Sequence, residues 1–173
     1  MVLSNPVSDV AAGESRIQVV HAAYGAPTVD VYLTAPDAEL SSASATLTLA
    51  YGEDSGQVDV ENGDYRIRLT GAGDDAVVYD SGTVSLADGG DYIIAATNNV
   101  AANSASSPVT LQVSDGEATT LINDADAGAD VRVVHAVADA PNVDVTLNDA
   151  ADPQIADLAF LSATDYLNLE AAE

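Results

Sequence analysis

A repeat within the chain constrains its fold more than any other feature of the sequence. Residues 19–33 read VVHAAYGAPTVDVYL and residues 133–147 read VVHAVADAPNVDVTL, so the two segments lie at a constant offset of 114 residues. Agreement of this length inside one chain indicates a duplication, and duplicated segments usually form copies of one structural unit. The sequence therefore predicts two copies of the same fold.

Three residue types recur at the same places in both copies and define what we term the repeat motif. They are a histidine, a proline six positions later and an aspartate three positions after that. The repeat continues more weakly, because residues 49–51 resemble 158–160 and residues 58–61 resemble 167–170, with five fewer residues in the middle of the second copy. The motif residues are His21, Pro27 and Asp30 in the first copy and His135, Pro141 and Asp144 in the second.

The hydrophobic pattern between these landmarks is that of β-strands throughout. Apolar and polar residues alternate at residues 58–60 and 66–69, which suits strands with one solvated face. Turn signals such as Asn62-Gly63, Ser81-Gly82 and Asp115-Gly116 separate many short segments, and this predicts an all-β fold, an immunoglobulin-like antiparallel β-sandwich. The predicted strands cover residues 16–22, 28–34, 45–51, 56–60, 64–70, 76–80, 83–86, 91–97, 109–114 and 117–122.

Two tyrosines follow glycines in a Gly-Asp-Tyr string at the start of a predicted strand. They are Tyr65 and Tyr92. A tyrosine at such a place can pack its ring inward while its hydroxyl bonds to the backbone at a corner of the sandwich. We therefore expect one or both to form a tyrosine corner.

The strings around the repeat motif resemble those of a known family. Residues 132–136 (RVVHA) and 139–145 (DAPNVDV) are similar to the signature that opens each repeat of the bacterial and archaeal family called domain of unknown function 4397. Tyr51-Gly52 and residues 63–65 fit two later elements of that family, so the similarity extends over residues 16–173. The resemblance implies a secreted or cell-surface β-sandwich, commonly arranged in tandem, with no established activity.

The two copies differ in length, which sets the expected domain organisation. We predict an N-terminal extension at residues 1–15, a complete sandwich at 16–123, an acidic linker at 124–129 and a partial second sandwich at 130–173. A sandwich without half of its strands leaves strand edges and an apolar face uncovered. Either the chain was cut there, or the second copy is completed by packing against the first sandwich or by strand complementation from a neighbouring molecule, with the N-terminal extension as a candidate donor strand.

The histidines and aspartates of the repeat motif allow two interpretations. His21 precedes Asp30 by nine residues and His135 precedes Asp144 by the same distance, so each pair is a candidate metal or acid/base site. The alternative, which the duplication favours, is a structural role in which each histidine ends one strand and is bonded to the next. The chain carries no nucleophile elbow, phosphate-binding loop or zinc motif, so we expect no catalytic residues and no enzyme activity.

A short acidic segment between the copies is a candidate calcium site. Asp124, Asp126 and Asp130 flank a glycine, and calcium prefers oxygen ligands. The twelfth position from Asp124 is His135 instead of the bidentate glutamate of an EF-hand loop. The alternative, which we favour, is a solvated, alanine-rich linker; no cofactor other than calcium is indicated.

The charge of the chain limits its partners. Its 28 acidic residues stand against four arginines, and the net charge is −24. Repulsion of this kind is screened near 1 M salt, where the Debye length is about 3 Å, so we expect a saline, halophilic setting. Nucleic acids and anionic lipids require clustered lysine or arginine, and a bilayer span requires about 20 apolar residues. We expect neither nucleic-acid binding nor membrane insertion.

Two functions of different classes remain. The first is an extracellular or cell-surface structural or adhesive protein, a self-assembling filament-type subunit whose partners are other copies of itself or related surface proteins. The second is a calcium- or carbohydrate-binding surface module. Carbohydrate platforms generally use exposed aromatic rings, and the chain has seven tyrosines, one phenylalanine and no tryptophan. This composition favours the structural protein.

Overall fold

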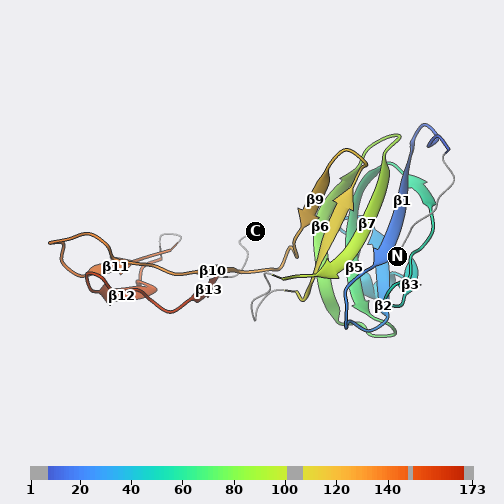
Figure 1. Cartoon of the computed structure of the whole chain (residues 1–173). Helices are drawn as coiled ribbons and strands as arrows, with labels where there is room; N and C mark the ends of the chain where they lie inside the picture. The colour runs from blue at the N-terminus through green and yellow to red at the C-terminus, as the bar shows by residue number, and fades with distance from the viewer. Residues whose placement is uncertain (1–7, 101–106, 148–149, 170–173) are drawn as a thin grey trace. The chain divides into compact units, whose positions relative to one another are not determined.

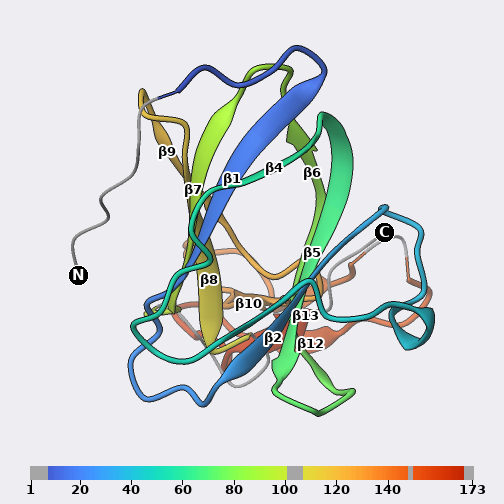
Figure 2. The ribbon, with the colours of Figure 1, turned by 90° about the vertical axis from the view of Figure 1, so that its right-hand side faces the viewer.

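The strand-forming segments of the first copy build two β-sheets that pack face to face (Figures 1 and 2). The computed structural model describes residues 8–100, 107–147 and 150–169. Its contacts divide the chain into two compact units, Met1–Ala127 and Gly128–Glu173. The first unit contains the sandwich, and the second contains the repeated segment.

Nine strands form the sandwich of the first unit. One sheet has five strands in the order β4-β1-β7-β8-β9, and the other has four in the order β3-β2-β5-β6. The strands are β1 (Glu14–His21), β2 (Val29–Thr34), β3 (Leu47–Leu49), β4 (Val58–Glu61), β5 (Gly63–Gly71), β6 (Val77–Leu86), β7 (Asp91–Asn98), β8 (Val109–Ser114) and β9 (Thr119–Ile122), with a 3-10 turn η1 (Leu40–Ser42) before β3. The prediction of an all-β sandwich is confirmed, while its immunoglobulin-like character remains a prediction.

The core lies between the two sheets because alternate residues of each strand point inward. Strand β1 contributes Ile17 and Val19, and strand β2 contributes Val29 and Val31 from the opposite sheet. One strand pair differs from the antiparallel pattern that the sequence predicts, because β1 pairs with β7 in parallel. The remaining core residues are Leu49, Ile67, Leu69, Tyr79, Leu86, Ile94, Ala96, Val109 and Leu111.

Ser81-Gly82 does not form the tight reversal that we predicted between two strands. Strand β6 runs through it without a break. The register changes there, since Arg66 lies opposite Thr83 whereas Arg68 lies opposite Asp80. One extra residue on β6 makes a β-bulge, and Gly82 has the positive φ of +62° that a bulge often requires. A Ser-Gly pair therefore signals a bulge as well as a turn.

Both tyrosines of the Gly-Asp-Tyr strings bond to the backbone as expected of tyrosine corners. The hydroxyl of Tyr65 donates to the carbonyl of Glu61 at 2.8 Å, and the amide of Ala87 donates to the hydroxyl of Tyr92 at 3.0 Å. A Cβ atom at Gly90 would lie 2.4 Å from the ring of Tyr92. Glycine is required there because the ring covers its Cα, and the prediction of tyrosine corners is confirmed for both residues.

The second unit contains four short strands in two pairs. Strands β10 (Ala129–Val131) and β13 (Leu167–Leu169) form one antiparallel pair, and β11 (Val143–Val145) and β12 (Ile155–Leu158) form the other. The part of the chain that the structure describes contains no helix that is long and apolar enough to cross a membrane.

Candidate functional site

Each motif histidine is bonded to the carbonyl of its motif proline. The Nε2 atom of His21 lies 2.9 Å from the carbonyl oxygen of Pro27, and that of His135 lies 3.0 Å from the carbonyl oxygen of Pro141. A carbonyl only accepts, so Nε2 must carry the hydrogen in both copies. The histidine thereby fixes the loop that leads into the next strand.

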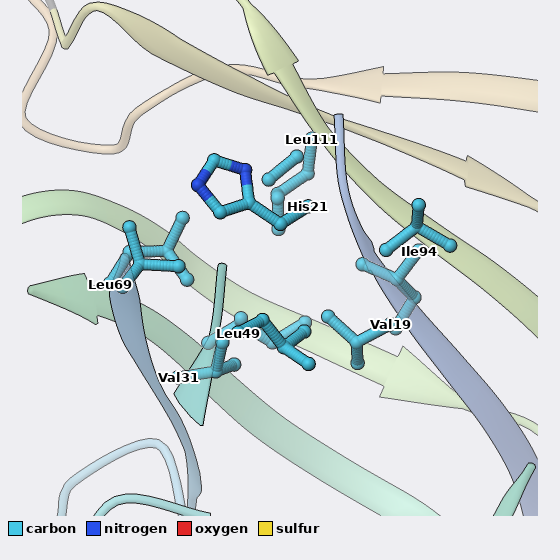
Figure 3. Close-up of a pocket in the computed structure, with 11 residues that line it drawn as sticks. Val19, His21, Val31, Leu49, Leu69, Ile94 and Leu111 are labelled. Carbon is cyan, nitrogen blue, oxygen red and sulfur yellow. The ribbon is translucent and has the colours of Figure 1, made fainter. Parts of the chain in front are cut away.

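The ring of His21 is enclosed by apolar side chains (Figure 3). It is 1% exposed, and Val19, Val31 and Leu49 are among the residues that line the small void beside it. Its Nδ1 atom has no hydrogen-bond partner within the described part of the chain. A buried apolar wall offers no further ligand for a metal ion, so the surroundings of His21 fit the structural interpretation.

The hydrogen-bond partners of the motif aspartates differ from those of the motif histidines. The carboxylate of Asp30 accepts from the Thr48 hydroxyl at 2.5 Å and from the Gly73 amide at 2.8 Å. The Thr48 bond, followed by the Gly73 bond, lowers the pKa of Asp30 below its ordinary value. In the second unit Asp144 accepts from the Asp157 amide at 2.7 Å. Histidine and aspartate therefore bond to different segments of the fold and do not form a dyad.

An aromatic ring packs against each motif histidine. The ring centroids of His21 and Tyr51 are 6.1 Å apart, and those of His135 and Phe160 are also 6.1 Å apart, both edge to face. Tyr51 additionally meets Tyr24 at 80°, and both tyrosines are exposed. Because these two rings are nearly perpendicular, they do not form the flat surface on which a sugar ring stacks.

The acidic segment lies against strand β6 of the sandwich. The Asp80 amide donates to the Asp124 carboxylate at 3.2 Å, and the Ala125 amide donates to the Asp80 carbonyl at 2.7 Å. Asp126 is exposed and Asp130 lies on β10. Among the described residues, no three acidic, histidine or cysteine side chains are grouped so that they could hold a metal ion.

We expect Asp124→Asn to stabilise the protein. Burial raises the pKa of the Asp124 carboxyl, and the charges of Asp126 and Asp80 act in the same direction. Because the pKa of Asp124 is higher in the folded than in the unfolded state, ionisation of this carboxyl destabilises the fold. The stabilising contribution of the protonated carboxyl is present at acid pH and is lost as the pH rises through the folded-state pKa. At neutral pH, thermal unfolding should show a melting temperature about 2–4 °C higher for the variant.

The same measurement tests calcium binding at this segment. An asparagine oxygen still accepts from the Asp80 and Asp126 amides, so only the charge is removed. We expect the gain with calcium and with chelator alike, and we expect it to fade at acid pH. A melting temperature that falls in Asp124→Asn only when calcium is present would instead establish a calcium site.

The second unit contains counterparts of the first four strands of the sandwich, with the register of β1 and β4 kept in β10 and β13 and a register shift between β11 and β12. In the first unit Ser15 lies opposite Val60 and Ile17 opposite Val58. At the offsets of the repeat the corresponding pairs are Ala129 with Leu169 and Val131 with Leu167, and both are found. Strands β10, β11, β12 and β13 are therefore the counterparts of β1, β2, β3 and β4.

The neighbours that complete these strands in the first unit have no counterpart among the described residues of the second. Strand β2 lies between β3 and β5, whereas β11 pairs with β12 in a two-stranded sheet. Likewise β1 lies between β4 and β7, whereas β10 pairs with β13 in a two-stranded sheet. We term the side of β11 that corresponds to the β5 side of β2 the open edge.

Two apolar residues that are buried in the first unit have exposed counterparts in the second, whereas Leu49 and its counterpart Leu158 are both buried. Val20 is 6% exposed and its counterpart Val134 is 59% exposed. Ala23 is 0% exposed, and its counterpart Val137 is 64% exposed. The sequence does contain a sign of this difference, since a valine replaces an alanine that has no room for a larger side chain. We take the open edge and, separately, these two exposed valines as the candidate functional features of the second unit.

Comparison with known proteins bears on the second unit. Residues 129–173 match the family model described as domain of unknown function (DUF4397), which confirms the resemblance for this segment. No curated protein and no solved structure was found to match the chain. Residues 1–7, which belong to the predicted donor strand, lie outside the described residues.

Proposed function

We propose that this protein is an extracellular or cell-surface structural protein whose sandwich repeats are joined by strand complementation. One observation carries the proposal. Strands β10 and β13 of the second unit keep the register of β1 and β4, but Val134 is exposed whereas its counterpart Val20 is buried. Burial of an exposed valine is favourable by roughly 1.5–3 kcal/mol. Added strands would therefore stabilise the second unit by covering residues that the first unit already covers.

The side chains of the repeat motif support a structural role over a chemical one. His21 and His135 each bond to a backbone carbonyl, and Asp30 and Asp144 each bond to backbone amides. All four polar groups are thus bonded to backbone groups of the fold. The net charge of −24 supports a saline exterior as the setting, because salt screens repulsion between assembled copies.

The mass distribution of the intact chain tests the proposal. In about 1 M KCl we expect light scattering and electron microscopy to show large assemblies that contain many copies of the chain. Val134→Asp should abolish them, because a charge cannot be buried by an added strand without a partner. Leu121→Asp is the matched control, since Leu121 is 60% exposed on β9 of the first unit, compared with 59% for Val134.

The two variants make the outcomes distinct. Large species in the unmodified chain and in Leu121→Asp, but not in Val134→Asp, would support assembly through the second unit. A monomer in the unmodified chain, or equal loss in both variants, would contradict it.

A further inference from the structure

We infer that the open edge of β11 binds, in antiparallel register, an extended strand in which arginine and threonine alternate with aliphatic residues, as they do in β5. The inference rests on the proposed function and specifies its partner. The first unit provides the template, because its β2 is the counterpart of β11 and is paired with β5 over residues 29–34.

The backbone of β11 presents its open hydrogen-bonding groups at alternate residues. The carbonyl of Val145 accepts from the Gln154 amide at 3.0 Å on the β12 side, as that of Val31 accepts from the Thr46 amide at 2.8 Å on the β3 side. Successive residues of a strand direct their amides and carbonyls to opposite sides. Asp144 therefore directs its groups to the open edge, and Thr146, which directly follows β11, does so when pairing extends the strand by one residue.

The register of the first unit identifies what an added strand would place opposite these groups. Asp30 pairs with Thr70 and Tyr32 pairs with Arg68. The amide of Ile67 donates to the Ser81 hydroxyl of β6, so the alternate residues Arg68 and Thr70 direct their backbone groups to β2. By correspondence, a threonine lies opposite Asp144 and an arginine lies opposite Thr146 in the completed sheet.

Charge favours this partner over the β11 edge of a second copy. Residues 128–173 contain nine acidic residues and one arginine, Arg132. Two β11 edges that approach each other would bring their Asp144 side chains close together, and like charges across strands are destabilising. A strand that carries two arginines, as β5 does at Arg66 and Arg68, reduces the negative charge of the second unit instead.

The test uses a labelled peptide of residues 62–71, NGDYRIRLTG, added to the intact chain in about 1 M KCl. We expect saturable binding by fluorescence anisotropy. N-methylation of the peptide at the arginine corresponding to Arg68 should weaken binding about tenfold or more, because that amide faces β11 and its hydrogen bond is lost. N-methylation at the leucine corresponding to Leu69 is the matched control and should leave binding unchanged.

The control also distinguishes binding at the open edge from a reaction in which the peptide replaces β5 of the sandwich. In the sandwich the Leu69 amide faces β6, so a peptide that replaced β5 would lose affinity when methylated at either position. Binding that is sensitive at Arg68 and insensitive at Leu69 supports the open edge. An absence of saturable binding, or equal affinity of the two methylated peptides, overturns the inference.

A chain variant separates this inference from the proposed function. Thr146→Pro removes an amide that faces the open edge, and it should abolish peptide binding. Large species that form in the unmodified chain while the peptide fails to bind would overturn the inference and leave the proposed function standing. Peptide binding by a chain that stays monomeric supports the inference and contradicts the proposed assembly.

Discussion

Replacement of Arg66 by methionine is expected to destabilise the sandwich by about 3 kcal/mol at neutral pH. The Arg66 guanidinium contacts the Asp80 carboxylate at 2.7 Å, and the Asp80 side chain is only 5% exposed. Removal of one partner of a buried pair leaves the other charge in a poorly solvated place. After the substitution Asp80 would keep the Gly82 amide as a donor, with Asp124 and Asp126 nearby to repel it.

Urea denaturation at constant high salt measures this effect without a change in charge screening. Arg16→Met is the matched control, because Arg16 pairs with Asp59, whose side chain is 42% exposed and can be solvated by water. We expect a smaller loss for the control. Addition of Asp80→Asn to Arg66→Met should recover part of the stability, since asparagine at position 80 carries no charge. Equal losses for the two arginine variants would show that the burial of Asp80 does not determine the effect.

The repeat predicts residue contacts in the second unit as well as the fold class of the chain. Residues of β1 and β4, shifted by 114 and 109 positions respectively, give the residue pairs found between β10 and β13. The same shifts turn the contact of His21 with Tyr51 into that of His135 with Phe160. Such agreement is possible because a duplicated segment keeps the residues that set its register. The Gly-Asp-Tyr strings also predict the hydroxyl contacts of Tyr65 and Tyr92, and at Gly90 the glycine leaves room for the ring of Tyr92.

Other features could not be read from the sequence because they depend on contacts between distant strands. The parallel pairing of β1 with β7 joins segments about 75 residues apart, and nothing local distinguishes it from an antiparallel pair. The ion pair of Arg66 with Asp80 joins β5 to β6 beside the bulge at Ser81-Gly82, which was predicted as a turn. A bulge and a turn use the same residue types, so the pattern alone does not separate them.

The candidate site was predicted in part. The repeat predicts that the second unit shares strands with the first, but the sequence does not show which edge of β11 is open. That edge is identified only by the alternation of backbone groups, which carries no side-chain signal. The bond of each histidine to a proline carbonyl was missed for the same reason, since any residue supplies a carbonyl.

Replacement of Tyr79 by alanine is expected to produce the largest loss of stability, about 3–5 kcal/mol. Tyr79 is 0% exposed in the core of the first unit. Its hydroxyl, on β6 of one sheet, donates to the carbonyl of Ile122 on β9 of the other sheet at 2.9 Å. Burial raises the pKa of Tyr79, so the hydroxyl keeps its hydrogen and remains a donor. The side chain therefore fills the core and joins the two sheets.

Tyr79→Phe separates these two contributions. It removes only the hydrogen bond, and the carbonyl of Ile122 still accepts from the Thr110 hydroxyl at 3.0 Å. The loss should therefore be about 1 kcal/mol. Tyr65→Phe is the control, because its hydroxyl bonds to the Glu61 carbonyl at an exposed place, where water can substitute. Urea denaturation should rank Tyr79→Ala far above Tyr79→Phe, with Tyr65→Phe lowest. If Tyr79→Phe and Tyr79→Ala cost the same, the hydrogen bond between the sheets, and not the packing of the ring, would be the main contribution of this residue.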